Sequence, residues 1–85
     1  MEEFYALIEE KIKNSGYPGH IDGREFYDEV NDEIDDKDNG TYIYMINKSE
    51  TVFYQGVIEI MDDDIDLRTL DIHVGEKVYH VDFDA

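Results

Sequence analysis

The spacing of the apolar residues changes at Asp38-Asn39-Gly40, and this change constrains the fold more than any other feature. Before this turn signal the apolar residues recur every three or four positions, as in amphipathic helices, whereas after it they alternate, as in strands. We therefore predict an α+β fold, with helices over 2–14 and 22–36 packed on one face of a four-stranded antiparallel meander, ααββββ. The strands are expected over 41–46, 51–61, 67–74 and 77–83.

Chain length and apolar content are suited to one small acidic domain over residues 1–85. Of the 85 residues 41% are hydrophobic, which is enough for one modest core. The chain contains no cysteine, so disulfides and thiolate chemistry are excluded. No basic region precedes an apolar run at the N-terminus, and no apolar run approaches the length of a membrane span. We expect a cytoplasmic protein.

Two short segments of the C-terminal half predict specific backbone geometry. Gly75-Glu76 separates two alternating runs, and glycine at the first position of a two-residue loop suits a type II′ turn. Gly56, inside the predicted strand 51–61, indicates a bulge or a close approach of two backbones. The turn sets the strand register, with the predicted cross-strand pairs Leu70 with Val81, Ile72 with Tyr79 and Asp71 with His80.

The predicted helix 22–36 concentrates negative charge on one side. Asp22 and Glu25 have the spacing of a capping box, which satisfies free amides in the first turn. The apolar residues Phe26, Tyr27, Val30 and Ile34 share one side of the helical wheel. An arc of roughly 160° on the other side holds the carboxylates of Glu25, Asp28, Glu29, Asp32, Glu33, Asp35 and Asp36.

This arrangement opposes the stability of the helix itself. Four like-charge contacts recur at a spacing of four residues, and each costs on the order of 0.2–0.5 kcal/mol when exposed. The polar side of helix 2–14, by contrast, mixes signs, as in the pair of Glu9 and Lys13. The concentration of like charge in helix 22–36 therefore indicates a binding surface rather than a requirement for solubility.

The overall charge restricts the class of partner. Seven Lys and Arg against 23 Asp and Glu give a net charge of −16, which disfavours binding to nucleic acid phosphates and to anionic membranes. We predict a basic nucleic-acid-binding protein, a nuclease or a toxin, as the partner. The predicted partner-binding residues are Glu25, Asp28, Glu29, Asp32, Glu33, Asp35, Asp36, Asp38, Asp62, Asp63, Asp64 and Asp66.

Three functions are compatible with this charge. Regularly spaced carboxylates can mimic the phosphates of DNA or RNA, so the favoured hypothesis is a non-enzymatic inhibitor that occupies the nucleic-acid site of the partner. In charge and size the chain resembles the small acidic inhibitors that phages and mobile elements carry against restriction or CRISPR nucleases, although no motif is shared. The alternatives are an immunity protein or antitoxin that neutralises a cognate toxic nuclease, and an acidic structural or regulatory module without a charge-specific role.

Catalysis is poorly supported by the residue types present. Ser15 and Ser49 fall in turn segments without a neighbouring base, and nucleophilic catalysis requires such a base. No glycine-rich phosphate loop with a lysine is present. Carboxylate pairs are so abundant that their presence carries little information about acid–base chemistry. We therefore expect no enzyme activity and no cofactor.

The last predicted hairpin contains the residue types of an alternative metal site, Asp71, His73, His80 and Asp82. Carboxylates and imidazoles are zinc ligands. Asp71 and His80 face each other in the predicted register, however, and a cross-strand ion pair on a solvated sheet face accounts for them without metal. We therefore favour the ion pair.

A calcium site at residues 35–40 is also disfavoured. Alignment of Gly40 with the invariant glycine of an EF-hand loop places Asp35 at the first ligand position. Lys37 then occupies the third position, and Ile46 occupies the twelfth, where a bidentate glutamate is required. The segment therefore lacks two ligands of the motif.

The strand 41–46 has apolar residues on both sides of its alternation. Tyr42, Tyr44 and Ile46 alternate with Ile43 and Met45. A strand of this kind needs cover on both faces. The pattern therefore predicts either a helix on each face of the sheet or a homodimer.

Overall fold

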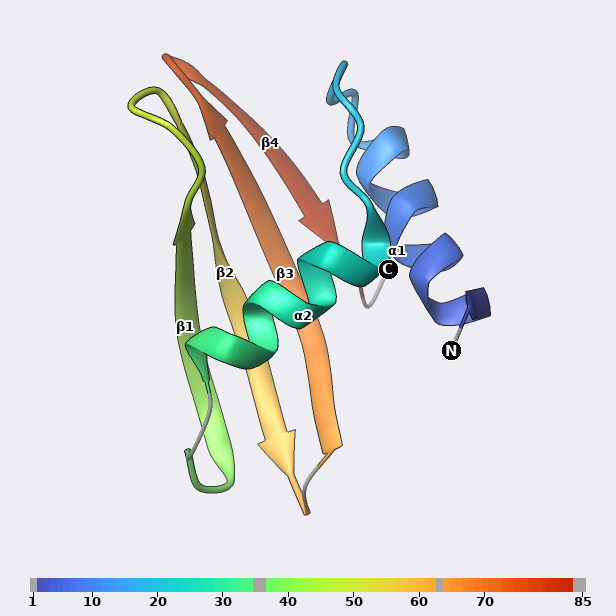
Figure 1. Ribbon diagram of the computed structural model, residues 1–85, viewed down its shortest axis with the longest axis vertical. Coiled ribbons are helices and arrows are strands. Elements are labelled where there is room, and N and C mark those ends of the chain that lie inside the picture. The colour runs from blue at the N-terminus through green and yellow to red at the C-terminus, as the bar shows by residue number, and fades with distance from the viewer. Residues whose placement is uncertain (1, 35–36, 63, 84–85) are drawn as a thin grey trace.

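The computed structural model describes residues 2–34, 37–62 and 64–83 of the chain. The helices are α1 (Glu2–Asn14) and α2 (Gly23–Glu33), and the strands are β1 (Gly40–Asn47), β2 (Val52–Met61), β3 (Asp64–Val74) and β4 (Lys77–Asp82). Neighbouring strands are antiparallel and lie in the order β1-β2-β3-β4 (Figure 1). The predicted α+β order, ααββββ, is confirmed.

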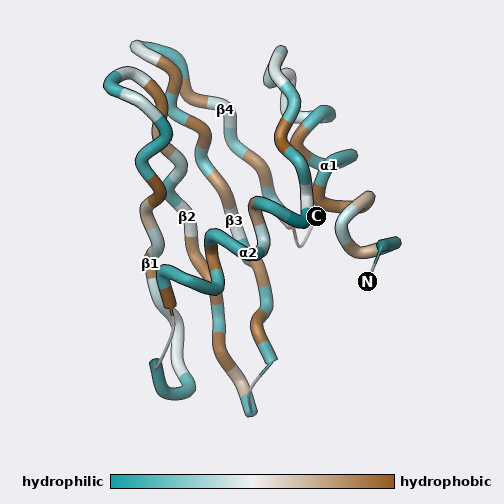
Figure 2. The backbone as a smooth tube through the Cα atoms, viewed as in Figure 1, coloured by the Kyte–Doolittle hydropathy of each residue, from teal (hydrophilic) through white to brown (hydrophobic). Residues whose placement is uncertain are grey.

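Both helices lie on the same side of the sheet. α2 crosses the sheet obliquely and reaches β1, whereas α1 packs against α2 and lies beside β4 (Figure 1). Hydrophobic and hydrophilic residues alternate along the strands (Figure 2), so one set of strand side chains meets the apolar sides of the helices. The buried core comprises Ile8, Ile12, Ile21, Phe26, Val30, Ile34, Tyr44, Ile46, Tyr54, Ile58, Ile60, Leu67, Leu70, Ile72 and Val81.

The two helices meet closely at the first turn of α2. A Cβ atom at Gly23 would lie 2.3 Å from the carbonyl oxygen of Tyr5, so this crossing requires a glycine. Glu9 Oε2 accepts a hydrogen bond from the Gly23 N–H (3.0 Å), and Asp22 Oδ1 accepts one from the Glu25 N–H (3.0 Å). The predicted capping role of Asp22 is confirmed, and a carboxylate of α1 supplies a second acceptor.

α2 is shorter than the predicted helix 22–36. It ends at Glu33, with Ile34 as the C-cap, and its last turn contains no basic residue. Carboxylates at this end oppose the negative end of the helix dipole, so further helical turns would gain no electrostatic support. Asp35 and Asp36, which the sequence pattern assigned to the helix, lie outside the described residues.

β3 begins earlier than the predicted strand 67–74. Its first residue is Asp64, which pairs with Met61 of β2, so the connection comprises only residues 62–63. Asp62 adopts a φ of 51°, a left-handed conformation that aspartate tolerates better than most residues. Asp64 and Asp66, expected in an acidic turn, are therefore strand residues.

A β-bulge explains why the start of β3 was not evident in the sequence. Ile65 and Leu67 are out of phase with Leu70 and Ile72 in a strict alternation, although all four pack in or against the core. The pairing of β2 with β3 shifts so that Arg68 is an extra residue in β3. The bulge turns both apolar sets towards the same face.

Gly56 marks a close approach of backbones, as predicted. A Cβ atom there would lie 2.1 Å from the carbonyl oxygen of Thr69 and 2.5 Å from the hydroxyl of Tyr44. Tyr44 lies opposite Gly56 in the sheet, and its hydroxyl donates a hydrogen bond to the Thr69 carbonyl (3.0 Å). The missing side chain therefore makes room for a buried phenol that bridges from β1 to β3.

The β3–β4 hairpin follows the predicted geometry. Gly75 has a φ of 60°, and Glu76 is not among the described residues with a positive φ, which is the sign pattern of a type II′ turn. The observed pairs are those predicted: Leu70 with Val81, Asp71 with His80 and Ile72 with Tyr79. Turn chemistry and alternation were sufficient to set this register.

Candidate functional site

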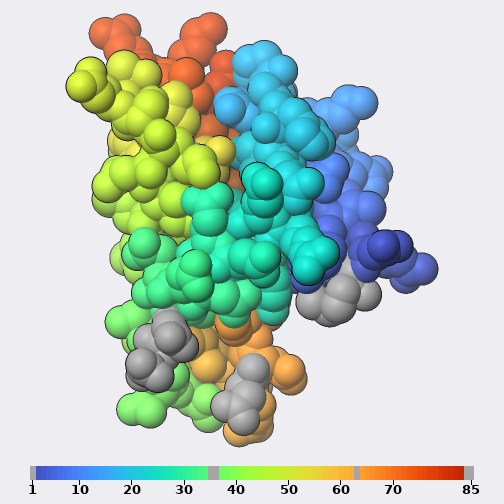
Figure 3. Space-filling view, viewed as in Figure 1, coloured from blue at the N-terminus to red at the C-terminus, as the bar shows by residue number. Residues whose placement is uncertain are grey.

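The described carboxylates of α2 follow one side of the helix by their spacing, and they are here called the acidic flank. Figure 3 shows α2 exposed across the centre of the face that carries the helices. Four of these side chains are exposed and that of Glu29 is half-buried. The flank consists of Glu25, Asp28, Glu29, Asp32 and Glu33.

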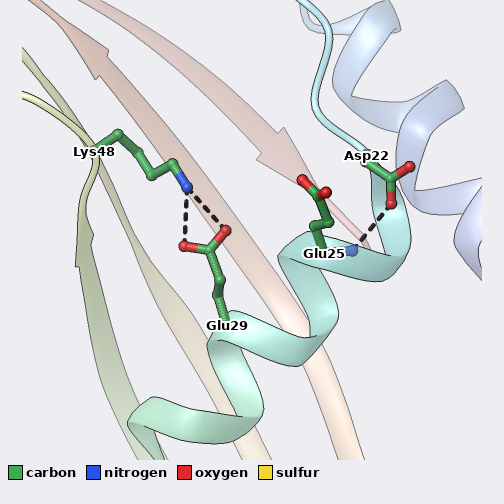
Figure 4. A network of polar contacts seen from close by, with 4 residues as sticks. All are labelled: Asp22, Glu25, Glu29 and Lys48. Carbon is green, nitrogen blue, oxygen red and sulfur yellow. Dashed lines mark hydrogen bonds and ion pairs between the residues drawn. The ribbon is translucent and has the colours of Figure 1, made fainter.

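Lys48 is a functional neighbour of the flank that sequence reasoning missed. Its Nζ lies 2.9 Å from Oε1 and 3.0 Å from Oε2 of Glu29 (Figure 4), and it lies 5.8 Å from the centre of the Tyr54 ring. The contact joins α2 to the β1–β2 hairpin. Because the two residues are far apart in the chain, no local sequence pattern indicates this pair. The positive charge of Lys48 compensates the negative charge of one of the five carboxylates.

The environment of Lys48 also affects a buried phenol. Burial, followed by the negative charges that Tyr17 and Glu29 can carry, raises the pKa of Tyr54 to about 12. The Tyr54 side chain is packed in the core beneath the flank. Its hydroxyl therefore stays protonated at neutral pH.

A cleft of about 400 Å³ separates the C-terminal half of α2 from β1. Its lining residues from the sheet all belong to β1, so it lies at the outer edge of the sheet. The lining consists of Glu29, Asp32, Glu33, Met45, Ile46 and Asn47. The cleft is acidic on the helix side and apolar to neutral on the strand side.

The remaining predicted acids lie at the opposite end of the strands from Lys48. Asn39 Oδ1 accepts a hydrogen bond from the Asp62 N–H (3.0 Å), which brings the connection before β1 next to the β2–β3 turn. Asp38 accepts a hydrogen bond from the Tyr42 hydroxyl through its carbonyl (2.7 Å). Asp63 lies outside the described residues. We call Asp38, Asp62, Asp64 and Asp66 the hairpin-end acids.

Two of the hairpin-end acids face away from the acidic flank. Asp64 and Asp66 are exposed and alternate with core-facing residues of β3, so they project from the sheet face opposite α2. Arg68 contacts Asp66 (3.4 Å) and Glu59 (2.7 Å) on that face. The described members of the predicted binding set therefore occupy two separate surfaces, of which the flank is the denser.

The sheet face opposite the helices, here called the open face, is covered by no element among the described residues. Ile43 is 71% exposed, Val78 54% and Met45 46%. The predicted apolar character of both sides of strand 41–46 is confirmed, but both helices lie on one side. A helix on each face is therefore excluded for the described chain, and a homodimer stays a prediction.

The alternative metal ligands on the open face have other contacts. His80 Nδ1 lies 2.5 Å from Asp71 Oδ1, as the predicted cross-strand pair requires. The His73 ring stacks on Phe53, with centroids 4.2 Å apart and planes 8° from parallel, and Asp82 pairs with Thr69. Among the described residues, no three side chains of metal-ligating type are placed to hold an ion.

The two serines are used in backbone contacts. Ser15 Oγ donates a hydrogen bond to the Ile12 carbonyl (2.5 Å) at the end of α1, and Ser49 Oγ accepts one from the Thr51 N–H (3.3 Å). A cleft of about 590 Å³ lies between α1 and the following loop and is lined by His20 and Glu9, whose closest atoms are 3.9 Å apart. Both serine oxygens therefore contact backbone atoms of the turns in which they lie.

Comparisons with known proteins gave no match, so the site is interpreted from its own chemistry. No protein family model, no curated protein and no solved structure matches the chain. Within the described ranges, no helix is both long enough and apolar enough to cross a membrane. The acidic flank and the cleft beside it are therefore the main features from which function can be argued.

Proposed function

We propose that this chain is a non-enzymatic inhibitor that binds a basic nucleic-acid-binding protein and blocks its nucleic-acid site. The observation that carries the proposal is the acidic flank, in which five carboxylates follow one side of one helix. Lys48 contacts one of them. A surface of this kind attracts a cationic groove and repels phosphates.

The spacing of the flank supports mimicry of a phosphate strand. From Glu25 to Glu33 the helix advances about 12 Å at 1.5 Å per residue. Five carboxylates over this length, one of which contacts Lys48, correspond to roughly one charge per 3–4 Å, comparable to the ~3.4 Å between phosphates along one strand of a duplex. The flank therefore approximates a short single row of phosphates rather than both strands.

The flank is also held in place before any partner binds. Phe26 and Val30 on the opposite side of α2 are fully buried, and Asp22 and Glu9 accept hydrogen bonds from the first turn. A preorganised row of charges loses little conformational entropy on binding. The net charge of −16 accelerates encounters with a basic surface at low salt.

The chemistry of the partner follows from these features. A nuclease that acts on DNA or RNA has the basic groove that the flank requires, so anti-defence inhibition of a restriction or CRISPR nuclease in the cytoplasm of a phage-infected cell is the favoured setting. Neutralisation of a toxic nuclease by an immunity protein would use the same electrostatics. The two settings differ in whether one cognate partner is encoded beside the gene.

Charge reversal at the flank tests the proposal. The test variant is Asp28→Lys, Asp32→Lys and Glu33→Lys, which leaves Glu29 in place because it contacts Lys48. The matched control is Glu2→Lys, Glu3→Lys and Glu10→Lys on exposed positions of α1. Each reversal adds two positive charges, so both variants change the net charge from −16 to −10.

Both variants and the wild type are used to capture proteins from a bacterial lysate at low and high salt, followed by mass spectrometry. We expect the wild type and the control to retain a basic nucleic-acid-binding protein that is released by salt or by competing duplex. The flank variant should lose it, with binding weakened about tenfold or more. Recovery of no such protein, or equal loss in both variants, would contradict the proposal.

A further inference from the structure

The two outer strands of the sheet differ in how their edges are protected. β4 has charged residues at both ends, Lys77 and Asp82, and α1 lies beside it. β1 contains no charged residue and no proline between Gly40 and Asn47, and its pairing with β2 has no bulge. Natural sheets usually protect an edge by one of these devices. Within the described residues β1 has no charge, no proline and no bulge, and its cover comes from α2, which contacts it on the helix side of the sheet.

Backbone alternation identifies the free groups of β1. Lys48 donates its N–H to the Val52 carbonyl across the hairpin (3.0 Å), so even-numbered residues of β1 face β2 in the antiparallel ladder. The odd-numbered residues therefore direct their N–H and C=O groups outward. These residues are Thr41, Ile43, Met45 and Asn47.

The same alternation places different chemistry on the two sides of this edge. The side chains of Ile43 and Met45 lie on the open face and are 71% and 46% exposed. On the helix side, the cleft between α2 and β1 presents Asp32 and Glu33 next to the strand. An added strand would therefore meet apolar side chains on one face and carboxylates on the other.

We propose that the outer edge of β1 accepts an extended segment of a basic partner protein as a fifth, antiparallel strand. Residues of this segment opposite Ile43 and Met45 are apolar, and the residues between them are Lys or Arg that contact Asp32 and Glu33. This inference rests on the proposed function for the basic nature of the partner, and it specifies how the partner is held. Main-chain bonds supply affinity and the alternating side chains supply specificity.

Charge favours this occupant over a second copy of the chain. Pairing of β1 with β1 of another copy would bring two acidic flanks to the same side of one sheet, and each copy has a net charge of −16. Like charges placed across an interface oppose association. A basic strand removes this repulsion because it compensates the carboxylates at the cleft.

The probe is a blocked nine-residue peptide of alternating Lys and Val, with binding measured by fluorescence anisotropy and by shifts of the backbone amide resonances of β1. In the proposed register the Val residues face Ile43 and Met45 and use their own N–H groups to bind β1. N-methylation of the Val residues should weaken binding about tenfold or more, whereas N-methylation of the Lys residues should leave it nearly unchanged. The reverse pattern, or equal effects, would overturn the proposal.

Met45→Pro tests the same edge from the protein side. The Met45 N–H points outward, so proline removes a free donor without removing a bond to β2. Binding of the unmodified peptide to Met45→Pro should be about tenfold weaker than to the wild type. Met61→Pro is not suitable as a control, because Met61 pairs with β3. The matched control is Leu7→Ala, an exposed apolar change on α1, which should bind the peptide normally.

The outcomes separate this inference from the proposed function. If the chain captures a basic protein through the flank but Met45→Pro captures it equally well, the strand addition is wrong and the inhibitor proposal stands. If the peptide binds at β1 but no basic protein is captured, the inhibitor proposal is wrong and the strand addition stands. A wild-type dimer in sedimentation that Met45→Pro converts to a monomer would overturn the basic strand in favour of a second copy.

Discussion

The two faces of the sheet have similar alternations of apolar residues but opposite surroundings. Tyr44 and Ile43 are neighbours in β1, yet Tyr44 is 2% exposed beneath α2 and Ile43 is 71% exposed on the open face. Both side chains are large and favour strands. The difference shows that apolar alternation determines which residues share a face, whereas the packing of the helices determines which face becomes the core.

The polar contacts also differ between the helix side and the open face. Apart from the tyrosines Tyr44 and Tyr54, no described polar or charged residue is buried on the helix side. The open face holds the Asp71–His80 pair, the contacts of Arg68 with Glu59 and Asp66, and the stacked Phe53 and His73 rings. Because of these polar contacts, the open face is less apolar than the helix side and can remain exposed to water. Ile43 and Met45 are still exposed on it and can contact a partner.

Truncation of one apolar residue on each face should give the largest difference in the free energy of unfolding. Leu70 is fully buried on the helix side, so Leu70→Ala should lower the free energy of unfolding by about 3–4 kcal/mol. Ile43→Ala, on the open face, should change it by less than about 0.5 kcal/mol. Urea unfolding followed by circular dichroism measures both, and similar losses would mean that the open face is covered in solution.

Addition of one carbon at Gly56 should lower the free energy of unfolding by less than Leu70→Ala does. The new Cβ of Gly56→Ala would lie against the Thr69 carbonyl and the Tyr44 hydroxyl, so backbone and phenol must shift at a cost of about 2 kcal/mol. Gln55→Ala changes the neighbouring, half-buried position on the open face and should cost less than about 1 kcal/mol. An unaffected unfolding midpoint for Gly56→Ala would show that β2 and β3 separate more easily than the contact distances indicate.

The smallest expected effect is a pH dependence of the folding stability that comes from tyrosines on the helix side. Burial raises the pKa of Tyr54 from its ordinary value of 10.0 to about 12, so the folded state holds the phenolic proton more tightly than the unfolded state. Its contribution is fully present below about pH 10 and is lost as pH rises through about 12. Burial also raises the pKa of Tyr44, which acts in the same direction.

Comparison of the wild type with Tyr54→Phe isolates this contribution. The difference in unfolding free energy between the two proteins should change by about 1–2 kcal/mol between pH 9 and pH 11.5, with the wild type losing more. Urea unfolding at fixed salt provides the measurement. A constant difference over this range would show that the Tyr54 hydroxyl is accessible to solvent in the folded protein.

Much of the fold was predictable because the decisive signals are local. Helix 2–14 and the β3–β4 register depend on residues within one element or one turn. The close approach at Gly56 was indicated by a glycine inside a strand pattern, although its contacts come from β1 and β3. The start of β3 was not predictable, because the bulge at Arg68 depends on pairing with β2. The end of α2 at Glu33 was misjudged because apolar spacing continues to Ile34, which is buried but only caps the helix.

The candidate site was predictable in part for the same reason. The acidic flank follows from helical spacing alone, so its five described members were identified from the sequence. The contact of Lys48 with Glu29 and the orientation of Asp64 and Asp66 towards the open face required the folded chain. No local pattern specifies which strand end lies beside which helix.

The sequence alone determined the order of the elements, the amphipathic helices and the one-sided charge of α2, because each depends on neighbours within a few residues. The tertiary structure decided which face of the sheet the helices cover and how the predicted acids are divided between two surfaces. It also left the edge of β1 free. These features depend on contacts between distant residues, whose outcome is set by packing and loop closure rather than by local periodicity.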